Sequence, residues 1–252
     1  MNGKDRYERC LTFIQSQMGN GSRKGHKGTD AVPKRVVTIS RQAGCGALMV
    51  AEKLAEYLQA REKNGSPRWT VFDRNLVERV LEEHRLPQRI GKFMPENWIS
   101  EIEDTIDELF GLHPPSWLLV RKTAETVLHL AKVGNVILIG RGANVVTAKL
   151  EGVFHVRLVA GLESRIRHIQ EVKRLDAKEA QAFIQREDTG RRRYLRRYYK
   201  RNIDDPLLYH LIINTDLMSY EAAAGLIADC VAGRFGAAEA VGSLSGDVVK
   251  TN

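Results

Sequence analysis

The stretch SRQAGCGALM, residues 40–49, lies between the apolar run RVVTIS (35–40) and the helical pattern VAEKLAEYLQA (50–60). A strand, a glycine-bearing loop and a helix in this order are typical of a phosphate site, because loop amides and a helix N-terminus attract anions. Gly44 and Gly46 allow the backbone to turn tightly toward such an anion. The usual loop ends in Lys-Ser or Lys-Thr, which contact the phosphates and Mg²⁺, whereas this one ends in Ala-Leu-Met. The stretch therefore predicts either an altered phosphate loop or an ordinary strand-to-helix turn.

The bulk properties narrow the classes of protein. The chain has 252 residues, which suits one α/β domain with an appendage or two small domains. Its net charge of +8 indicates an anionic partner, without choosing among a nucleotide, a nucleic acid and an acidic protein. Three widely spaced cysteines without a CxxC pair argue against a disulfide framework or a zinc site. No apolar run is long enough to cross a bilayer, and no secretory signal pattern opens the chain, so we expect a cytoplasmic protein without a membrane partner.

Short apolar, β-branched runs alternate with longer helical patterns from residue 35 onward. The runs are RVVTIS (35–40), WTVF (69–72), NVILI (135–139), VFHVRLV (153–159) and LYHLIIN (208–214). Near-continuous apolar strands between helices predict a parallel sheet covered on both faces. Ligands of such sheets bind beyond the carboxyl ends of the strands. The candidate site residues are therefore those that follow each run: Arg41 to Gly46, Asp73 and Arg74, Gly140 to Asn144, and Asn214 to Asp216.

The remaining segments suggest the domain organisation. Residues 1–18 predict an amphipathic helix, and this helix could pack back on the domain, dimerise or bind another protein. Its apolar face would carry Tyr7, Leu11, Ile14 and Met18. A Gly- and Lys-rich linker is predicted at 19–34, a main domain at 35–232, a helical insertion at about 85–114, and a flexible tail at 233–252.

An arginine cluster, REDTGRRRYLRRYYKR, occupies residues 186–201. Seven of its eight basic residues are arginines, which suit bidentate contacts to phosphate. The cluster fits a solvated helix face, a surface on which single-stranded nucleic acid stacks, or a basic lid that closes over transferring phosphates. It also contains Asp188 and leads into the fifth strand, which favours the lid.

Four single residues have two interpretations each, and a fifth, Cys45, has one. Arg41 could replace the missing loop lysine with a permanent charge, or lie on the surface. Arg141 follows the third strand and either projects at the ligand edge or pairs with a nearby carboxylate. Asp73 either accepts from a ribose, a base or a metal-bound water, or caps a helix. Arg165 points inward or into solvent, and Cys45 is best read as a small loop filler. The histidines show no metal-ligand spacing, so the metal ligands stay unknown.

Taken in order, six segments resemble the cytidylate kinase-like family, a divergent branch of the nucleoside monophosphate kinases. They are VTISRQAGCG, FDRNLVERV, ILIGRGANVV, FHVRLVAGLESRIRHI, REDTGRRRYLRRYY and DDPLLYHLIINTD, and they cover roughly residues 35–230. The resemblance implies a P-loop NTPase-type, three-layer α/β fold with a five-stranded parallel sheet flanked by helices. It also implies a loop for the donor ATP with Mg²⁺, a helical insertion that binds the acceptor, and an arginine-rich lid at about 186–201.

The resemblance carries roles onto particular residues. Donor-phosphate contacts fall to Gly44, Cys45, Gly46 and Ala47, and acceptor contacts to Asp73, Arg74, Arg141 and Arg193. The candidate catalytic residues are Arg41, Arg186, Asp188 and Arg191, and Asn214 with Thr215 matches the "NT" after the last strand. Two positions depart from the pattern of well-characterised cytidylate kinases, because Ala47 replaces their loop lysine and Gly142 replaces the aspartate of their "GRD". The cytidylate kinase-like branch itself often lacks that lysine.

Three functions follow as hypotheses. The first is ATP-dependent phosphoryl transfer to a nucleoside monophosphate, with CMP or dCMP as the expected acceptor. The second is a nucleotide-binding module without turnover, suggested by Ala47 and Met49. The third is a nucleic-acid binder that uses residues 186–201, with binding that weakens steeply as salt is added.

Overall fold

The computed structural model describes residues 3–20, 35–62, 67–73, 76, 96–110 and 117–244, with side chains over 5–13, 35–62, 67–73, 76, 101–110 and 117–235. Most of the predicted linker and much of the predicted insertion lie outside the described residues. Of that insertion, the helix α5 (Glu96–Phe110) is described. None of the described helices is long and apolar enough to span a membrane.

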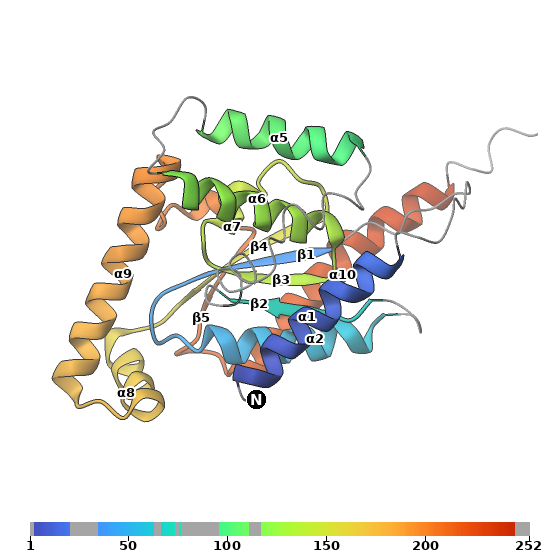
Figure 1. Ribbon diagram of the computed structural model, residues 1–252. Coiled ribbons are helices and arrows are strands. Elements are labelled where there is room, and N and C mark those ends of the chain that lie inside the picture. The colour runs from blue at the N-terminus through green and yellow to red at the C-terminus, as the bar shows by residue number, and fades with distance from the viewer. Residues whose placement is uncertain are drawn as a thin grey trace, which may run out of the picture.

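Five parallel strands form one sheet in the order β2-β3-β1-β4-β5 (Figure 1). The strands are β1 (Val36–Arg41), β2 (Thr70–Phe72), β3 (Val136–Ile139), β4 (Val153–Val159) and β5 (Leu211–Asn214). In the central strand β1, Val36 is in register with Val136 on one side and Val153 on the other. Because all of these neighbouring strands are parallel, their carboxyl ends lie at one edge of the sheet. The predicted α/β fold with a five-stranded parallel sheet is confirmed.

Helices cover both faces of the sheet, because successive side chains of each strand point to opposite faces. On one face, α2 (Ala47–Ala60) and α10 (Tyr220–Leu244) pack on Val37, Ile39 and Ile137. On the other, α6 (Leu118–Val133), α7 (Ala143–Val146) and α5 contribute to a core with Val36, Val136 and Leu138. Figure 1 shows these two helical layers above and below the strands. The near-continuous apolar runs of the inner strands β1, β3 and β4 therefore reflect burial on both faces, whereas the edge strand β5 is partly exposed, with Ile212 at 45%.

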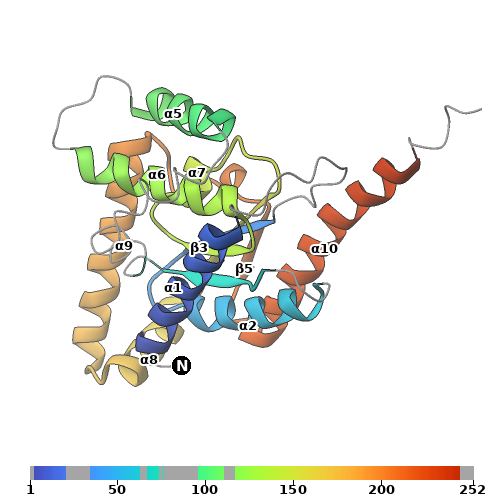
Figure 2. The same cartoon turned by 45° about the vertical axis from the view of Figure 1, so that its right-hand side comes forward.

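The N-terminal helix α1 (Gly3–Asn20) packs back on the domain beside β2 (Figure 2). Its buried residues are Cys10 and Phe13, and Phe13 meets Phe72 edge-to-face at 5.9 Å between ring centroids. Of the face predicted from the sequence, Tyr7 packs partly buried against the same core, Leu11 is partly exposed, and the side chains of Ile14 and Met18 lie outside the described residues. The helix lies against the edge strand β2, and this contact selects the face that carries Cys10 and Phe13.

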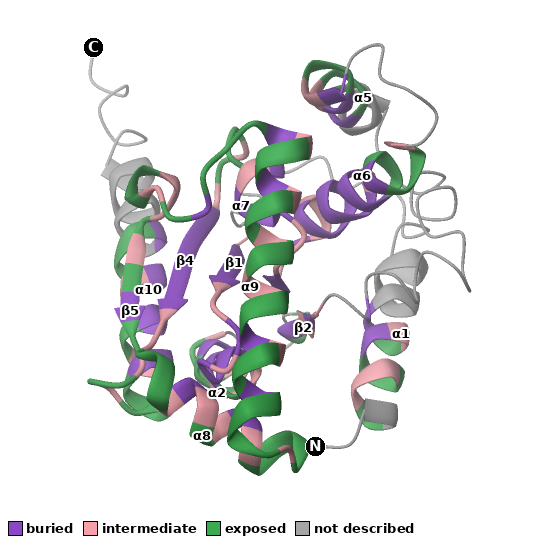
Figure 3. Ribbon diagram, turned by 90° about the vertical axis from the view of Figure 1, so that its left-hand side faces the viewer, coloured by how far each residue is buried: buried purple, intermediate pink, exposed green. Residues whose placement is uncertain are grey.

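Two further helices lie beside the sheet, at the end where the β1–α2 loop leaves it. They are α8 (Leu162–Lys173) and α9 (Ala177–Tyr199), and Figure 3 shows α9 crossing in front of the strands. A capping box begins α9, because the side chain of Asp176 accepts from the Glu179 amide and Glu179 bonds back to Asp176. The short 3₁₀ helix η2 (Pro206–Leu208) precedes β5, and α10 continues to Leu244, into the segment predicted as a tail.

Candidate functional site

The loop between β1 and α2 has two glycines in the left-handed region, Gly44 with φ 84° and Gly46 with φ 71°. Both are also required by close neighbours. A Cβ on Gly46 would lie 2.2 Å from Cζ of Tyr220, and one on Gly44 would lie 2.8 Å from the carbonyl oxygen of Arg165. The loop thus has the conformation of an anion nest. Its glycines are covered by Tyr220 and by α8.

Cys45 and Ala47 are buried and shape this loop. The Cys45 thiol donates to the carbonyl of Gln42 at 3.1 Å, and burial raises its pKa to about 11, so it is a neutral thiol at physiological pH. Thr215 lies with Oγ1 3.2 Å from the Cys45 carbonyl and 3.3 Å from that of Val159, and it can donate to either. The "NT" position therefore ties the end of β5 to the loop.

Arg41 leaves the end of β1 and lies against Gly140, at the end of β3. A Cβ on Gly140 would fall 1.8 Å from Nη1 of Arg41, so only glycine leaves room for this guanidinium. Burial lowers the pKa of Arg41 to about 9, and repulsion from Arg191 adds to the effect. The side chain still carries its charge at neutral pH. Arg41 is therefore a fixed cation at the shared edge of β1 and β3.

A cavity of about 320 Å³ opens between this edge and α9. Four arginines and a single carboxylate are among its described lining residues, so the cavity is strongly positive. The lining consists of Ser40, Arg41, Gly140, Arg141, Gly142, Asn144, Arg186, Glu187, Gly190, Arg191, Tyr194, Leu195 and Ile203. Clustered guanidinium groups suit a phosphorylated ligand. The structure thus brings together four of the predicted site residues: Arg41, Arg141, Arg186 and Arg191.

The turn after β3 is shaped by α9. Arg141 has a positive φ of 55°, and its guanidinium lies 5.7 Å from the ring centre of Tyr194. A Cβ on Gly142 would lie 2.6 Å from Cε2 of Tyr199. Gly142 therefore makes room for an aromatic side chain of α9.

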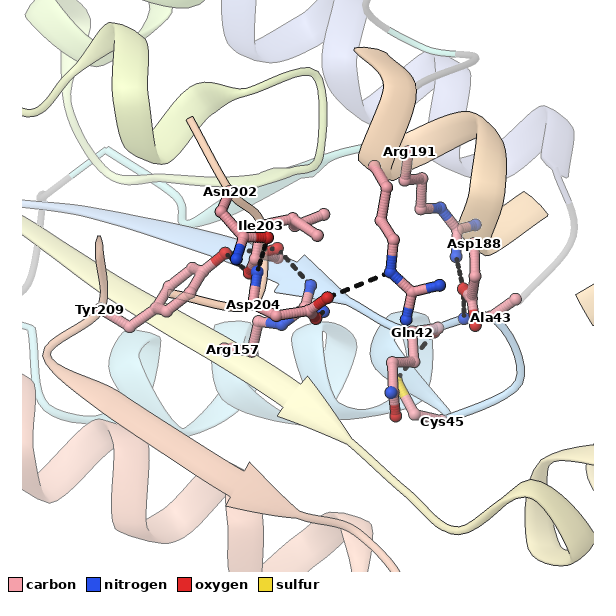
Figure 4. A network of polar contacts seen from close by, with 12 residues as sticks. Gln42, Ala43, Cys45, Arg157, Asp188, Arg191, Asn202, Ile203, Asp204 and Tyr209 are labelled. Atoms are coloured by element: carbon pink, nitrogen blue, oxygen red, sulfur yellow. Dashed lines mark hydrogen bonds and ion pairs between the residues drawn. The ribbon is translucent and has the colours of Figure 1, made fainter. Parts of the chain in front are cut away.

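Asp188 points to the loop, and the described lining of the cavity does not include it. Its Oδ1 accepts from the amide of Ala43 at 2.7 Å, and its Oδ2 accepts from Nη1 of Arg165 at 2.6 Å. Nη1 of Arg191 lies 3.3 Å from Oδ1 (Figure 4). Arg165 thus points inward, which was one of its two interpretations.

Other predicted site residues lie elsewhere. Asp73 accepts from the amide of Leu76 at 2.9 Å, as a helix cap does, and pairs with Arg6 of α1 at 3.3 Å. Arg193 is exposed and is not among the described residues that line the cavity. The predicted donor contacts Gly44, Cys45, Gly46 and Ala47 are also not among the described residues that line the cavity. Arg74 lies outside the described residues. The roles of these residues stay predictions.

Arg157 is a buried cation that was not among the residues predicted from the sequence. Arg157 of β4 is only 4% exposed, and it donates to Oγ of Ser40 at 2.9 Å and to Oδ1 of Asp204 at 2.8 Å. Asp204, which is labelled in Figure 4, also accepts from Nε of Arg192 on α9 at 3.0 Å. The signal was a lone arginine within the apolar run VFHVRLV. A charge inside a buried strand needs a partner, which here links the cavity residue Ser40 to the segment after α9.

The described residues of the site do not include a cluster of metal ligands. Within the part of the chain that the structure describes, no group of three or more His, Cys, Asp or Glu side chains is placed to hold a metal ion. Mg²⁺ often binds through substrate phosphates and water with few protein ligands, and such binding does not need a cluster of this kind.

Comparison with known proteins places this site in a family. A crystal structure of an uncharacterized protein from Eubacterium ventriosum is similar in fold, with a TM-score of 0.54 and 14% identity over 79% of this chain and 98% of that chain. None of the curated proteins compared with the chain matches it. The cytidylate kinase-like family matches residues 36–217, which contain all five strands, the loop and α9. The chain therefore belongs to the cytidylate kinase-like family.

Proposed function

We propose that the protein transfers a phosphoryl group from ATP to a nucleoside monophosphate, with CMP or dCMP as the first acceptor to test. The observation that carries this proposal is the cavity lined by Arg41, Arg141, Arg186 and Arg191. It lies at the carboxyl edge of a parallel sheet, where ligands of such folds bind. Family membership supports nucleotide kinase chemistry. Family membership does not specify the base of the acceptor, so cytosine is part of the proposal.

Charge neutralisation by these arginines would supply most of the catalysis. Phosphoryl transfer passes through a loose transition state whose charge is spread over the oxygens of the transferring group, so positioning and electrostatics dominate. Arg41 lies close to Arg141 and Arg191, and their mutual repulsion is relieved when an anion binds among them. An arginine from the strand end would then take the place of the loop lysine that Ala47 replaces. Arg41 would thus supply the positive charge that the lysine supplies in an ordinary phosphate loop.

The donor triphosphate would bind at the loop, whose glycines adopt the backbone of an anion nest. Mg²⁺ bound to the donor would add positive charge beside the arginines. The fit is incomplete in the structure, because Tyr220 lies against Gly46 and Asp188 occupies the amide of Ala43. A triphosphate at the loop would therefore compete with Asp188 for the amide of Ala43.

The same contacts favour a second candidate function, a nucleotide-binding module without turnover. A carboxylate on the loop amide and an aromatic ring on the loop glycine both compete with donor phosphates. In that case the arginine cavity would bind a nucleoside monophosphate as a signal. This candidate predicts saturable nucleotide binding without any product.

A chromatographic assay for diphosphate product separates the two candidates. Purified protein is incubated with ATP and Mg²⁺ and, separately, with CMP, dCMP, UMP, AMP or GMP. CDP or dCDP as the main product would support the proposal, and a different diphosphate would keep the reaction but correct the acceptor. If folded protein binds a monophosphate in a calorimetric titration and forms no product with any acceptor, the kinase proposal is wrong and the binding module is supported.

A further inference from the structure

A buried ion pair connects α8, α9 and the loop. The side chains of Arg165 and Asp188 are 10% and 12% exposed, and Nη1 of Arg165 lies 2.6 Å from Oδ2 of Asp188. The pair also bonds to both backbone polar groups of one loop residue, Ala43. Asp188 accepts from the amide of Ala43 at 2.7 Å, and Arg165 donates to the carbonyl of Ala43 at 3.3 Å. Loop and helices are thus held together by charge-assisted bonds.

Apolar contacts surround the pair. Ala43 is buried in a small cluster with Ile169 of α8 and with Ala180 and Ile184 of α9. Gly44 adjoins the backbone of Arg165, where a Cβ would come within 2.8 Å of the carbonyl oxygen. This packing reduces the access of water, so an unpaired charge at this place would be costly.

The pair also bears on Arg191. Arg191 lines the cavity, and its guanidinium lies 3.3 Å from Asp188 and 3.3 Å from Glu187, on the same turns of α9. Asp188 therefore has two cationic partners, one short and one long. Arg191 is already paired with Asp188 and Glu187, and Arg165, which makes the shorter contact, balances much of the charge of Asp188. Without Arg165, we expect the contact between Arg191 and Asp188 to shorten and to draw the guanidinium of Arg191 away from the cavity.

We propose that Arg165 is a positioning residue, which satisfies Asp188 so that Arg191 remains available to a phosphate in the cavity. The inference rests on the proposed function for its meaning in catalysis, but it concerns anion binding and does not require turnover. Asp188 then acts through Arg191 and the loop, although the sequence placed it among the catalytic candidates. An opposite role for Asp188, competition with phosphate at the loop amide, predicts different results in the same experiment.

Calorimetric titration with pyrophosphate tests the proposal in the full-length protein. Arg165→Gln leaves the charge of Asp188 unbalanced, and we expect affinity to fall about tenfold or more, because Arg191 is drawn away from the cavity. Arg165→Lys supplies a single cationic nitrogen, as Nη1 does now, and should stay within about threefold of wild type. The double variant Arg165→Gln/Asp188→Asn removes the charge that would capture Arg191, and it should regain most of the lost affinity.

The control is Arg196→Gln, which removes the same charge from the exposed side of α9. Thermal unfolding of every variant separates a loss of folding from a loss of binding. If Arg165→Gln does not fold, the lysine and double variants carry the test, since both are expected near wild-type affinity. Binding by Arg165→Gln that matches the Arg196→Gln control, or a double variant that binds no better than Arg165→Gln, would overturn the proposal. An affinity gain in Arg165→Gln/Asp188→Asn above wild type would instead support competition by Asp188.

The outcomes remain distinct from those of the proposed function. Wild-type protein that binds pyrophosphate but makes no diphosphate product removes the kinase proposal and leaves the role of Arg165 intact. Wild-type protein that turns over, with an Arg165→Gln variant of unchanged affinity and unchanged KM, removes the positioning role alone.

Discussion

Gly140 offers a way to move Arg41 without changing it. In Gly140→Ala the new Cβ would fall 1.8 Å from Nη1 of Arg41, far inside van der Waals contact. The displaced atom is the end of a flexible side chain, so the guanidinium can swing away at little cost in folding. The backbone itself has φ 84°, and an L-residue in the left-handed region costs about 1–2 kcal/mol. We therefore expect the free energy of unfolding to fall by about 1–2 kcal/mol.

The loss of binding should be larger than this strain suggests. A hydrogen bond to a charged group contributes about 1.5–3 kcal/mol, which corresponds to roughly a 10- to 100-fold change in affinity. Displacement of Arg41 should therefore weaken pyrophosphate binding by about that factor. The assays are calorimetric titration for binding and urea unfolding for stability. Gly152→Ala is the matched control, because Gly152 also has a positive φ of 78° and is not among the described cavity residues.

For the control we expect a similar loss of stability and an affinity within about twofold of wild type. The reasoning is refuted if Gly140→Ala binds pyrophosphate as wild type does. It is also refuted if Arg41→Ala weakens binding as much in the Gly140→Ala background as in wild type, because the guanidinium would then still be in place.

Three further predictions concern stability and reactivity. Burial lowers the pKa of His155 to about 4, with smaller contributions from His210 and Arg234. The histidine of the unfolded chain takes up its proton near pH 6.5. The free energy of unfolding should therefore be highest above that pH and fall by up to about 3 kcal/mol toward pH 4. Urea unfolding at several pH values should show a flatter profile for His155→Gln. Phe13→Ala should lower the free energy of unfolding by about 3 kcal/mol, because the ring packs on Phe72, and an unchanged urea midpoint would contradict that packing. A thiol reagent at pH 8 should modify Cys230 first and Cys45 only after unfolding, since burial raises the pKa of Cys45 to about 11; rapid labelling of Cys45 would contradict its place in the loop.

The sheet was predictable because its inner strands β1, β3 and β4 are buried on both faces. Apolar runs on both faces distinguish such strands from the helices between them, and the five runs correspond to β1 to β5. The convergence of Arg41 and Arg141 was predictable for a related reason. Both follow strands of a parallel sheet, and the carboxyl ends of these strands meet at one edge.

The direction of individual side chains was harder to predict. The inward face of α9 is set by the buried residues Ala180, Ile184, Leu195 and Tyr199, and this face turns Arg191 inward and Arg193 outward. The composition of the arginine cluster does not predict how α9 is rotated about its axis. Asp73 illustrates a second difficulty, because a carboxylate after a strand serves equally well as a helix cap, and here the local hydrogen bond to Leu76 prevails.

Partners distant in the sequence were the least predictable. Arg157 bonds to Ser40 and to Asp204, which lie 117 and 47 residues away. The ion pair of Arg165 and Asp188 joins two helices and a loop. A charge in an apolar run indicates that such a partner exists, but only the packed sheet and helices identify it.

The arginines of the cavity are proposed to supply the positive charge that the missing loop lysine would bring to the transferring phosphates. The most direct test is the single-turnover rate of Arg41→Ala, measured with ATP, Mg²⁺ and the acceptor that gives the most product. We predict that the rate falls by about 10²–10³-fold, as expected for removal of one transition-state cation, while the melting temperature changes little. A folded Arg41→Ala protein that turns over within about twofold of wild type would contradict the claim.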